Sequence, residues 1–205
     1  MKTKKFINSF LQEDLEIAQK INREDLEKIV NILFEAWKNG KKVFTMGNGG
    51  SLPTASHFAG DLAKYTIAHG KPRFRTICLN DNAEIVSALT NDEGFDSIFS
   101  EQLVPWLEKG DVIVAFSVHG GVGFGNAGAW SQNLGKAVKL AKERKAKIIG
   151  FSGDMGGMLK EEADACIVIP PVNREHITPH TEGWHSILAH LIVHRLKEMI
   201  KESPR

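Results

Sequence analysis

The sequence has few cysteines and no long apolar run. Its 205 residues include two cysteines, Cys78 and Cys166, each inside a short apolar stretch. Cysteines in that setting are typical of small buried hydrophobic residues in a reducing compartment, so a disulfide is not expected. No stretch approaches the roughly 18 uninterrupted apolar residues of a membrane-spanning helix, and polar residues follow the basic start at positions 1–6. We therefore expect a cytoplasmic protein that is neither secreted nor embedded in a membrane.

The sequence also lacks an excess of charge of one sign. It has 26 Lys and Arg against 25 Asp and Glu, a formal net charge of +1. Such a balance offers no global field that would attract nucleic acid or an anionic membrane, so neither is an expected partner and any phosphate must be held locally. With 42% hydrophobic residues, a chain of this length can bury one substantial core. Because no linker or repeat interrupts it, we expect a single domain over residues 1–205.

Two kinds of apolar pattern follow each other along the chain. The first forty residues carry two amphipathic helical patterns, which predict an N-terminal helical hairpin over residues 1–40 that serves in packing or oligomerisation. A last amphipathic helix is expected from about Glu182 to Ile200. Between them, five short apolar runs predict strands at residues 42–46, 75–79, 111–117, 147–152 and 166–169.

The order of these elements predicts the fold class. Helical segments separate the five runs, and the central runs are almost wholly apolar. Strands of that kind pair in parallel, with helices covering both faces and right-handed crossovers between neighbours. We therefore expect an α/β fold, a three-layer sandwich with a five-stranded parallel sheet preceded by the helical hairpin.

A glycine-rich turn follows the first predicted strand. Residues 47–51 read Gly-Asn-Gly-Gly-Ser, with Ser51 as the expected N-cap of a helix that tolerates Pro53 in its first turn. At the carboxyl end of a parallel strand, free helix N–H groups favour an anion, and phosphate is the natural candidate. A tight turn without ligand fits the same pattern. No Lys-Ser/Thr follows the glycines and no third glycine has dinucleotide spacing, so nucleotide cofactors are disfavoured.

His57 and Asp61 stand four residues apart on the helix that this turn opens. Both side chains then project from one helix face about one turn apart, which suits two ligands of a small metal ion. Taken alone, the same pair is more often a surface hydrogen bond.

Residues 47–51, continuing as Ala-Ser-His-Phe-Ala-Gly-Asp-Leu at 55–62, resemble the phosphoheptose isomerases of the SIS family. In that family the glycine turn precedes a His-Phe-Ala-x-Glu helix. Residues 90–99 and 110–112 are similar to later parts of the family, so the resemblance spans nearly the whole chain. It implies the SIS fold, a homotetramer with active sites at subunit interfaces, and zinc in many members. The implied reaction converts sedoheptulose 7-phosphate to D-glycero-D-manno-heptose 7-phosphate through an enediolate.

The resemblance also implies roles for particular residues. Asp61 is the candidate base and His190 the candidate acid. The expected metal ligands for Zn²⁺ are His57, Asp61, Glu182 and His190. The expected substrate and phosphate contacts are Asn48, Gly49, Gly50, Ser51, Asn91, Asp92, Ser117, His119 and Glu182.

The chain departs from the family pattern at three places. Asp61 replaces the family's glutamate and Glu182 its glutamine, which keeps the oxygen ligands, adds a formal charge and shortens the candidate base. Residues 118–133 replace a serine-rich phosphate loop with a longer stretch that is rich in glycine and poor in hydroxyls. Its glycines can still present N–H groups to a phosphate, with His119 as a charged contact and Ser131 capping the next helix. A mobile lid is the alternative interpretation.

The histidines near the C-terminus pose a geometric question. Eight residues of straight helix put Glu182 and His190 about 12 Å apart, so we expect either a non-helical entry at Glu182 or ligands from different subunits. His185, three residues after Glu182, is a rival ligand. The remaining histidines have no partner at diagnostic spacing and are interpreted as surface or packed residues, with a loop at His180 near the ligand site as an open possibility. They are His69, His176, His180 and His194.

Two other functions stay open from the sequence. SIS domains also serve as non-catalytic sensors or scaffolds, including relatives that bind a replication initiator. Retention of His57, an acid at position 61 and His190 argues against a pure scaffold. An isomerase or epimerase of another phosphorylated or nucleotide-linked sugar is the third hypothesis, with residues 118–133 reshaping the pocket.

Overall fold

The five apolar runs form one parallel sheet. The computed structural model describes residues 2–121 and 131–204. The strand order is β2-β1-β3-β4-β5, with every neighbouring pair parallel, so the predicted fold class is confirmed. Each strand lies within one residue of its predicted bounds. The strands are β1 (Lys42–Gly47), β2 (Arg75–Cys78), β3 (Val112–Phe116), β4 (Lys147–Ser152) and β5 (Ala165–Val168).

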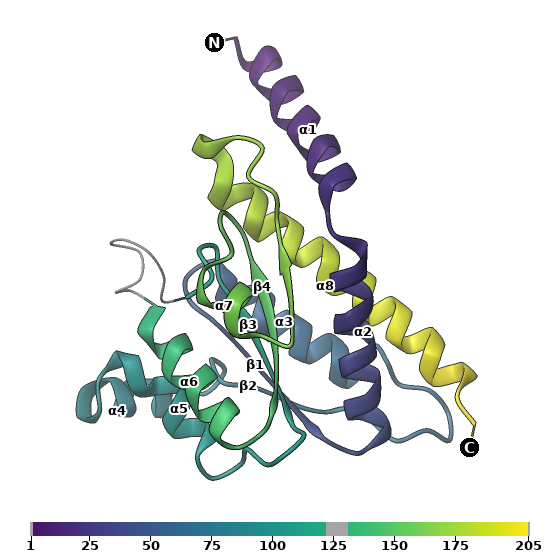
Figure 1. Cartoon of the computed structure of the whole chain (residues 1–205), viewed down its shortest axis with the longest axis vertical. Helices are drawn as coiled ribbons and strands as arrows, with labels where there is room; N and C mark the ends of the chain where they lie inside the picture. The colour runs from purple at the N-terminus through teal and green to yellow at the C-terminus, as the bar shows by residue number, and fades with distance from the viewer. Residues whose placement is uncertain (1, 122–130, 205) are drawn as a thin grey trace.

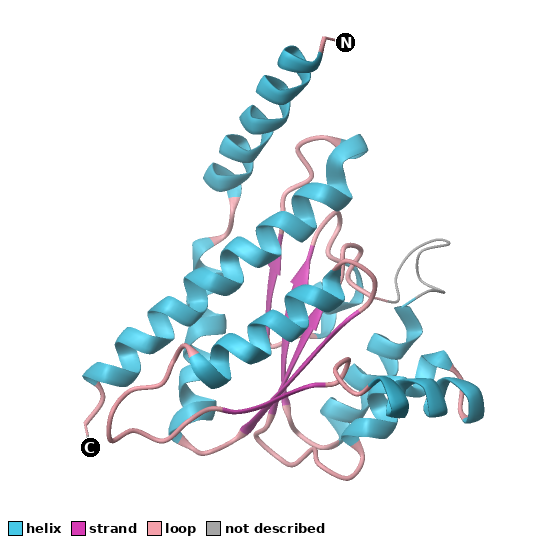
Figure 2. Ribbon diagram, turned by 180° about the vertical axis from the view of Figure 1, so that it is seen from behind, coloured by secondary structure: helices cyan, strands magenta, loops and turns pink. Residues whose placement is uncertain are grey.

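Alternate strand residues enter two cores on opposite faces of the sheet. In β3, Val112 and Val114 belong to one core, and Ile113 and Ala115 belong to the other. This alternation follows from the two-residue repeat of a strand, and it makes the three layers visible in Figures 1 and 2. On the first face lie α2 (Arg23–Lys38), α3 (Ser51–Lys64) and α8 (Ile177–Glu202). On the second lie α5 (Ile98–Leu103), α6 (Gln132–Glu143) and α7 (Gly157–Glu162), with α4 (Ala83–Asp92) packed beside α5.

The two N-terminal helices differ in how they pack. Helix α2 is capped by Asn22, whose side chain accepts from the backbone N–H groups of Glu24 and Asp25, and it packs on the sheet. Helix α1 (Thr3–Lys20) buries only Ile17 among its described residues. Figure 1 shows α1 projecting beyond the body of the molecule. Apolar side chains are therefore left exposed along it, at Phe6, Ile7, Leu11 and Leu15.

The strand order brings two loops together. From β1 the chain crosses to β2 on one side, and it later returns to β3 on the other side of β1. The turn after β1 and the loop after β3 therefore leave the same edge of the sheet from adjacent strands. This is the topological switch point at which open α/β sheets bind ligands.

Three predicted details of the helices are wrong. The N-cap of α3 is Gly50, without a side-chain cap, and Ser51 is the first helical residue. Helix α8 begins at Ile177 rather than near Glu182, because Pro179 lies in the first turn, where its missing N–H costs nothing. A non-helical entry at Glu182 is therefore excluded.

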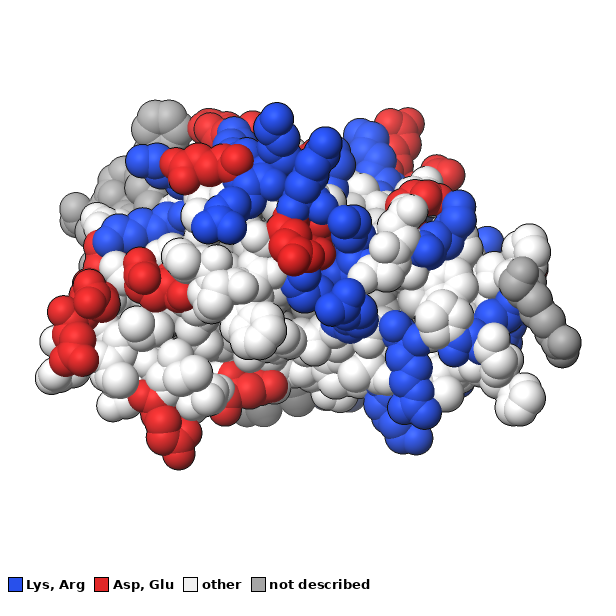
Figure 3. Space-filling view, turned by 90° about the horizontal axis from the view of Figure 1, so that it is seen from below, with Lys and Arg blue, Asp and Glu red and all other residues white. Residues whose placement is uncertain are grey.

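The described surface matches the balanced composition. The face in Figure 3 carries Lys and Arg as well as Asp and Glu, so no charge of one sign covers it. Both cysteines are free and buried, as predicted. Burial raises the pKa of Cys166 to about 12, which keeps its thiol protonated. Among the described helices, none combines the length and apolar content that crossing a bilayer requires.

Candidate active site

The glycine turn after β1 is tightly closed. The Asn48 carbonyl accepts from the N–H of Ser51 at 3.0 Å, and Gly49 adopts a φ of 55°. A Cβ atom on Gly47 would lie 2.6 Å from the Ser51 carbonyl oxygen, so only glycine fits there. The Asn80 amide accepts from the Gly47 N–H at 3.1 Å and donates to the Gly47 carbonyl at 2.9 Å. Asn80, which the sequence did not point to, thus fixes the end of β1.

Replacing Gly47 with alanine is expected to weaken binding of inorganic phosphate at least about tenfold, because the new methyl group forces the turn backbone apart. The matched control is Gly60→Ala in α3, where an added Cβ meets nothing within 4 Å. That change should leave phosphate binding unaltered and stabilise the helix by about 0.5–1 kcal/mol. Calorimetric titration and thermal unfolding measure both. Equal phosphate affinity in the two variants would contradict this account of the turn.

Most of the predicted substrate contacts line one cavity. It encloses about 530 Å³ at the switch point between β1 and β3. The glycine turn forms one wall, the loop after β3 forms another, and the first turns of α6 and α8 complete it. The lining residues are Asn48, Gly49, Gly50, Ser51, Phe116, Ser117, Val118, His119, Ser131 and Glu182.

Asn91 and Asp92 are not brought to this cavity. Both are exposed at the end of α4, and the Asn91 amide donates to the Asp92 carboxylate at 2.7 Å. Within one chain, the structure therefore separates this predicted pair from the other substrate contacts.

The loop after β3 is shaped by glycine. Gly120 and Gly121 have φ angles of 75° and 86°, and the buried Ser117 hydroxyl accepts from the Gly121 N–H at 3.2 Å. His119 stands half-exposed with Nδ1 3.7 Å from the Asp154 carboxylate. The predicted long loop falls mainly on residues 122–130, which lie outside the described residues. Ser131 occupies the N-cap position of α6, but its side chain makes no capping hydrogen bond there.

A pair of asparagines joins the turn to α6. The Asn48 and Asn133 amides exchange two hydrogen bonds of 2.9 Å, and Asn133 is fully buried. Because its amide is engaged, the Asn48 side chain holds the first turn of α6 against the cavity. The sequence did not single out Asn133.

Glu182 lies against the glycine turn. A Cβ atom on Gly50 would overlap the Glu182 carboxylate, so the absence of a side chain at position 50 makes room for it. The carboxylate is half-buried and lines the cavity. A negative group there disfavours a phosphate beside it and favours the hydroxyl groups of a sugar.

A second group of polar side chains lies further along α3 and α8. The Asp61 Oδ2 atom is 3.3 Å from His57 Nε2 and 3.3 Å from His190 Nδ1. The two imidazole side chains are 56% and 51% exposed, and their rings meet edge to face at 5.0 Å. One ligand atom from each of the three residues lies within 4.8 Å of the others. Two imidazole nitrogens and a carboxylate oxygen are a donor set that suits zinc, so the residues present fit that ion.

Glu182 is separate from this group. It shares the continuous helix α8 with His190, so about 12 Å of helix axis lies between them. Of the four predicted metal ligands, the structure brings together His57, Asp61 and His190.

Contacts between α3 and α8 define a groove. Glu182 meets Gly50, His190 meets Asp61, and the Tyr65 hydroxyl is 3.3 Å from His194 Nδ1. Because the paired positions increase together, the two helices run side by side in the same direction, as Figure 2 shows. The cavity at the glycine turn and the His57–Asp61–His190 group therefore lie along one groove.

His185 does not belong to this groove, so its role as a rival ligand is wrong. It is fully buried, with Nε2 3.1 Å from the Ser152 carbonyl oxygen and its ring between those of Phe116 and Phe151. Burial lowers the pKa of His185 to about 4, against the smaller opposing effect of its hydrogen bond to Ser152. His185 is a neutral histidine of the core.

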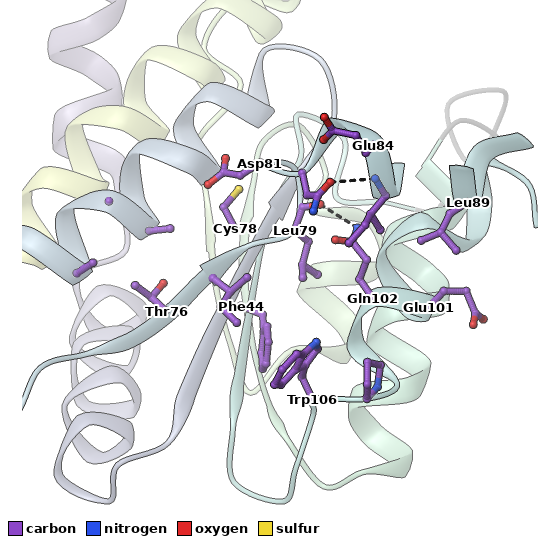
Figure 4. Close-up of a pocket in the computed structure, with 17 residues that line it drawn as sticks. Phe44, Thr76, Cys78, Leu79, Asp81, Glu84, Leu89, Glu101, Gln102 and Trp106 are labelled. Atoms are coloured by element: carbon purple, nitrogen blue, oxygen red, sulfur yellow. Dashed lines mark hydrogen bonds between the residues drawn. The ribbon is translucent and has the colours of Figure 1, made fainter. Parts of the chain in front are cut away.

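A larger cavity of about 900 Å³ lies beside the edge strand β2. Figure 4 shows Phe44, Leu79 and Trp106 along it, with the Gln102 amide donating to the Leu79 carbonyl at 2.9 Å. Its charged lining residues are all carboxylates, Asp81, Glu84 and Glu101. Three carboxylates repel a phosphate, and none of the predicted site residues lines this cavity, so the smaller cavity is the better phosphate site despite its size.

Comparison with known sequences places the chain among relatives. The family model for the SIS domain matches residues 6–153. The lincomycin biosynthesis protein LmbN of Streptomyces lincolnensis is 48% identical over 161 residues, which cover 78% of this chain. The matched region spans only 58% of that relative's length. A phosphoheptose isomerase of Aliarcobacter butzleri is 34% identical over 190 residues, which cover 91% of this chain and 92% of that protein.

Comparison with solved structures gives the same fold. A phosphoheptose isomerase from Francisella tularensis matches with a TM-score of 0.82, covering 97% of this chain and 100% of the other. At 23% identity this is a likeness of fold.

Proposed function

The chain belongs to the SIS-domain family as a relative of the phosphoheptose isomerases, and from that premise we propose that it isomerises a sugar phosphate between its ketose and aldose forms. One observation carries the proposal. A glycine-lined anion cavity and a His57–Asp61–His190 group lie along the same groove between α3 and α8. One end suits a phosphate and the other suits proton transfer at a carbonyl.

The separation of the two ends supports a long sugar. Glu182 marks the cavity and His190 marks the second group, about 12 Å apart along the axis of α8. That is the scale of an extended open-chain heptose phosphate rather than of a triose phosphate. We propose sedoheptulose 7-phosphate as the substrate and D-glycero-D-manno-heptose 7-phosphate as the product.

At the cavity, the phosphate would be bound by backbone N–H groups. The first turn of α3 leaves N–H groups free beside the turn, and the helix dipole favours an anion there. The proposed phosphate contacts are Asn48, Gly49, Gly50, Ser51, Ser117 and His119. Glu182 would instead accept hydrogen bonds from sugar hydroxyls.

At the other end, Asp61 would act as the base. Both histidines contact its Oδ2 atom, which leaves Oδ1 to remove the proton from the carbon beside the carbonyl and return it to the neighbouring carbon. His190 would donate a proton to the carbonyl oxygen and recover one from the adjacent hydroxyl. In the reverse direction the same residues exchange these tasks.

His57, Asp61 and His190 are the residues that would hold a Zn²⁺ ion. The ion would polarise the sugar carbonyl and offset the negative charge of the enediolate. The neighbouring imidazoles orient the Asp61 carboxylate with or without it.

The exposure of this group supports an oligomer. Proton transfer of this kind benefits from exclusion of water, yet His57 and His190 are half-exposed in one chain. Exposed apolar side chains flank them, at Leu52, Tyr65, Ile187 and Leu191. We propose that another copy covers the groove, in a homotetramer with its sites at subunit interfaces. Asn91 and Asp92 would then serve a neighbouring copy's cavity. The free, buried cysteines support a cytoplasmic setting for this reaction.

A second candidate function rests on the relative with 48% identity. Its printed name assigns it to lincomycin biosynthesis rather than to heptose metabolism. The same groove would then isomerise another phosphorylated sugar, with the part of the chain between Ser117 and Asn133 setting the choice.

The purified protein is expected to convert sedoheptulose 7-phosphate to an aldose in deuterated water, with deuterium at C2 of the product. The reaction should be measured by NMR with and without added Zn²⁺. Exchange at C2 with little aldose formed would favour another sugar as the true substrate. No product and no exchange, with or without zinc, would contradict the isomerase proposal, and binding without turnover would favour a sensor.

A further inference from the structure

A second cluster of imidazoles and carboxylates joins α1 to the start of α8, at the end of the molecule where α1 projects (Figure 1). The Glu13 Oε2 atom is 2.8 Å from His176 Nδ1 and 2.7 Å from His180 Nε2. The side chains of Glu13, His176 and His180 are 14%, 19% and 4% exposed. None of the three residues lines the groove between α3 and α8.

We propose that Glu13, His176 and His180 bind a divalent transition-metal ion of the Zn²⁺ type, which fixes α1 to the body of the protein. One ligand atom from each residue lies within 4.8 Å of the others. Two imidazole nitrogens and one carboxylate oxygen are typical zinc ligands, whereas Ca²⁺ and Mg²⁺ prefer oxygen ligands alone. The histidines stand four residues apart at the start of α8, a spacing that turns both toward one ion.

The surroundings hold the ligands as in known metal sites. His180 Nδ1 lies 3.1 Å from Asp14 Oδ1, which also accepts from Trp184 Nε1 at 2.9 Å. A carboxylate on the far nitrogen keeps the proton at Nδ1, so that Nε2 faces the cluster as an acceptor. Asn173 Nδ2 donates to Glu13 Oε1 at 2.8 Å, which leaves Oε2 for an ion.

The cluster is slightly tighter than a loaded site. Ligand bonds of about 2.0–2.1 Å in tetrahedral geometry separate the ligand atoms by about 3.3 Å. The two distances from Glu13 Oε2 are 2.8 and 2.7 Å, so loading would widen the group by about half an ångström. Small rotations of the side chains provide that change.

An ion here would have a structural consequence. Helix α1 buries only Ile17 among its described residues, and beyond Ile17 it reaches α8 through this cluster and through Phe10, whose ring lies 4.2 Å from that of His180. The ion would thus set the direction of α1, and with it the position of the exposed apolar stripe that includes Leu11 and Leu15.

The test uses the full chain with His57→Ala and His190→Ala, which removes two donors of the other group. Titration with Co²⁺ alone is expected to give visible d–d absorption that saturates near one equivalent, and Zn²⁺ should raise the melting temperature. Adding Asp14→Asn, which removes no ligand, should weaken Co²⁺ binding about 10–100-fold. Adding His176→Gln should abolish it, while His69→Gln, at an exposed position outside both groups, should leave it unchanged.

Two outcomes would overturn the proposal. One is no cobalt absorption in a double variant whose circular dichroism is native, which would leave the cluster as hydrogen bonds alone. The other is binding that neither Asp14→Asn nor His176→Gln changes, which would put the ion elsewhere. Because the test uses no sugar, its failure would leave the isomerase proposal untouched.

Discussion

Replacing Asp61 with asparagine is expected to lower kcat on sedoheptulose 7-phosphate by about 10²–10⁴-fold, the range typical of a lost general base. The amide has nearly the same shape but cannot take a proton from carbon. Asp61 is partly exposed and contacts two half-exposed imidazoles rather than the core, so the fold should persist. Steady-state kinetics would show the loss mainly in kcat, and deuterium incorporation at C2 should fall by the same factor.

Two further variants sharpen this experiment. Asp81→Asn removes the same charge from a carboxylate that accepts from the Ser56 hydroxyl at 2.7 Å outside the groove, and kcat should change less than about twofold. Asp61→Glu restores the family's longer carboxylate and should retain proton exchange far above that of Asp61→Asn. Unchanged deuterium exchange in Asp61→Asn would remove Asp61 from the role of base.

The sheet was predictable because its signals are local and consistent. Each strand is a short apolar run, and the buried strands β1 and β3 lack the alternation of a half-exposed strand. The errors arose where two local signals fit equally well. Pro179 is compatible with a helix start or with a break, and Ser51 suits the N-cap as well as the first helical position.

The candidate site was predictable only where its parts are close in sequence. The glycine turn, His57 and Asp61 stand on one turn and one helix, so spacing alone relates them. Asn133 could not be paired with Asn48, because 85 residues separate them and only the folded sheet brings α6 to the turn. His176 and His180 have ligand spacing in the sequence, but their partner Glu13 lies more than 160 residues earlier.

His185 shows a signal that was present but overlooked. It shares a helix face with Leu188, Ile192 and Leu196, at positions that continue the apolar stripe of α8. A histidine in that stripe is expected in the core rather than in a groove, and the structure buries it between Phe116 and Phe151. Its spacing from Glu182 favoured a shared face, but burial of the stripe decided its position.

Replacing His185 with leucine is expected to remove part of the protein's sensitivity to acid. Burial lowers the folded-state pKa of His185 to about 4, against 6.5 for the exposed side chain. As the pH falls below 6.5, the unfolded chain binds a proton that the native protein does not bind until about pH 4, so stability falls across that window. For this residue alone the loss between pH 7 and pH 5 is about 2 kcal/mol.

The structure gives the reason that the native protein resists this proton. His185 Nε2 donates to the Ser152 carbonyl, and Nδ1 is buried without a hydrogen-bond partner among the described residues. A proton on Nδ1 would place a charge between two phenylalanine rings with no acceptor to receive it. The neutral imidazole is therefore the form that fits the core.

The matched pair His185→Leu and His185→Gln separates titration from hydrogen bonding. Neither side chain titrates, so both variants should lose about 2 kcal/mol less than the parent between pH 7 and pH 5. Glutamine can still donate to Ser152, and should exceed leucine in stability by about 1 kcal/mol at pH 7 if its amide is otherwise accommodated. Urea unfolding at one protein concentration measures both differences, since assembly makes apparent stability depend on concentration. If both variants kept the parent's pH dependence, another group would be responsible for the acid sensitivity.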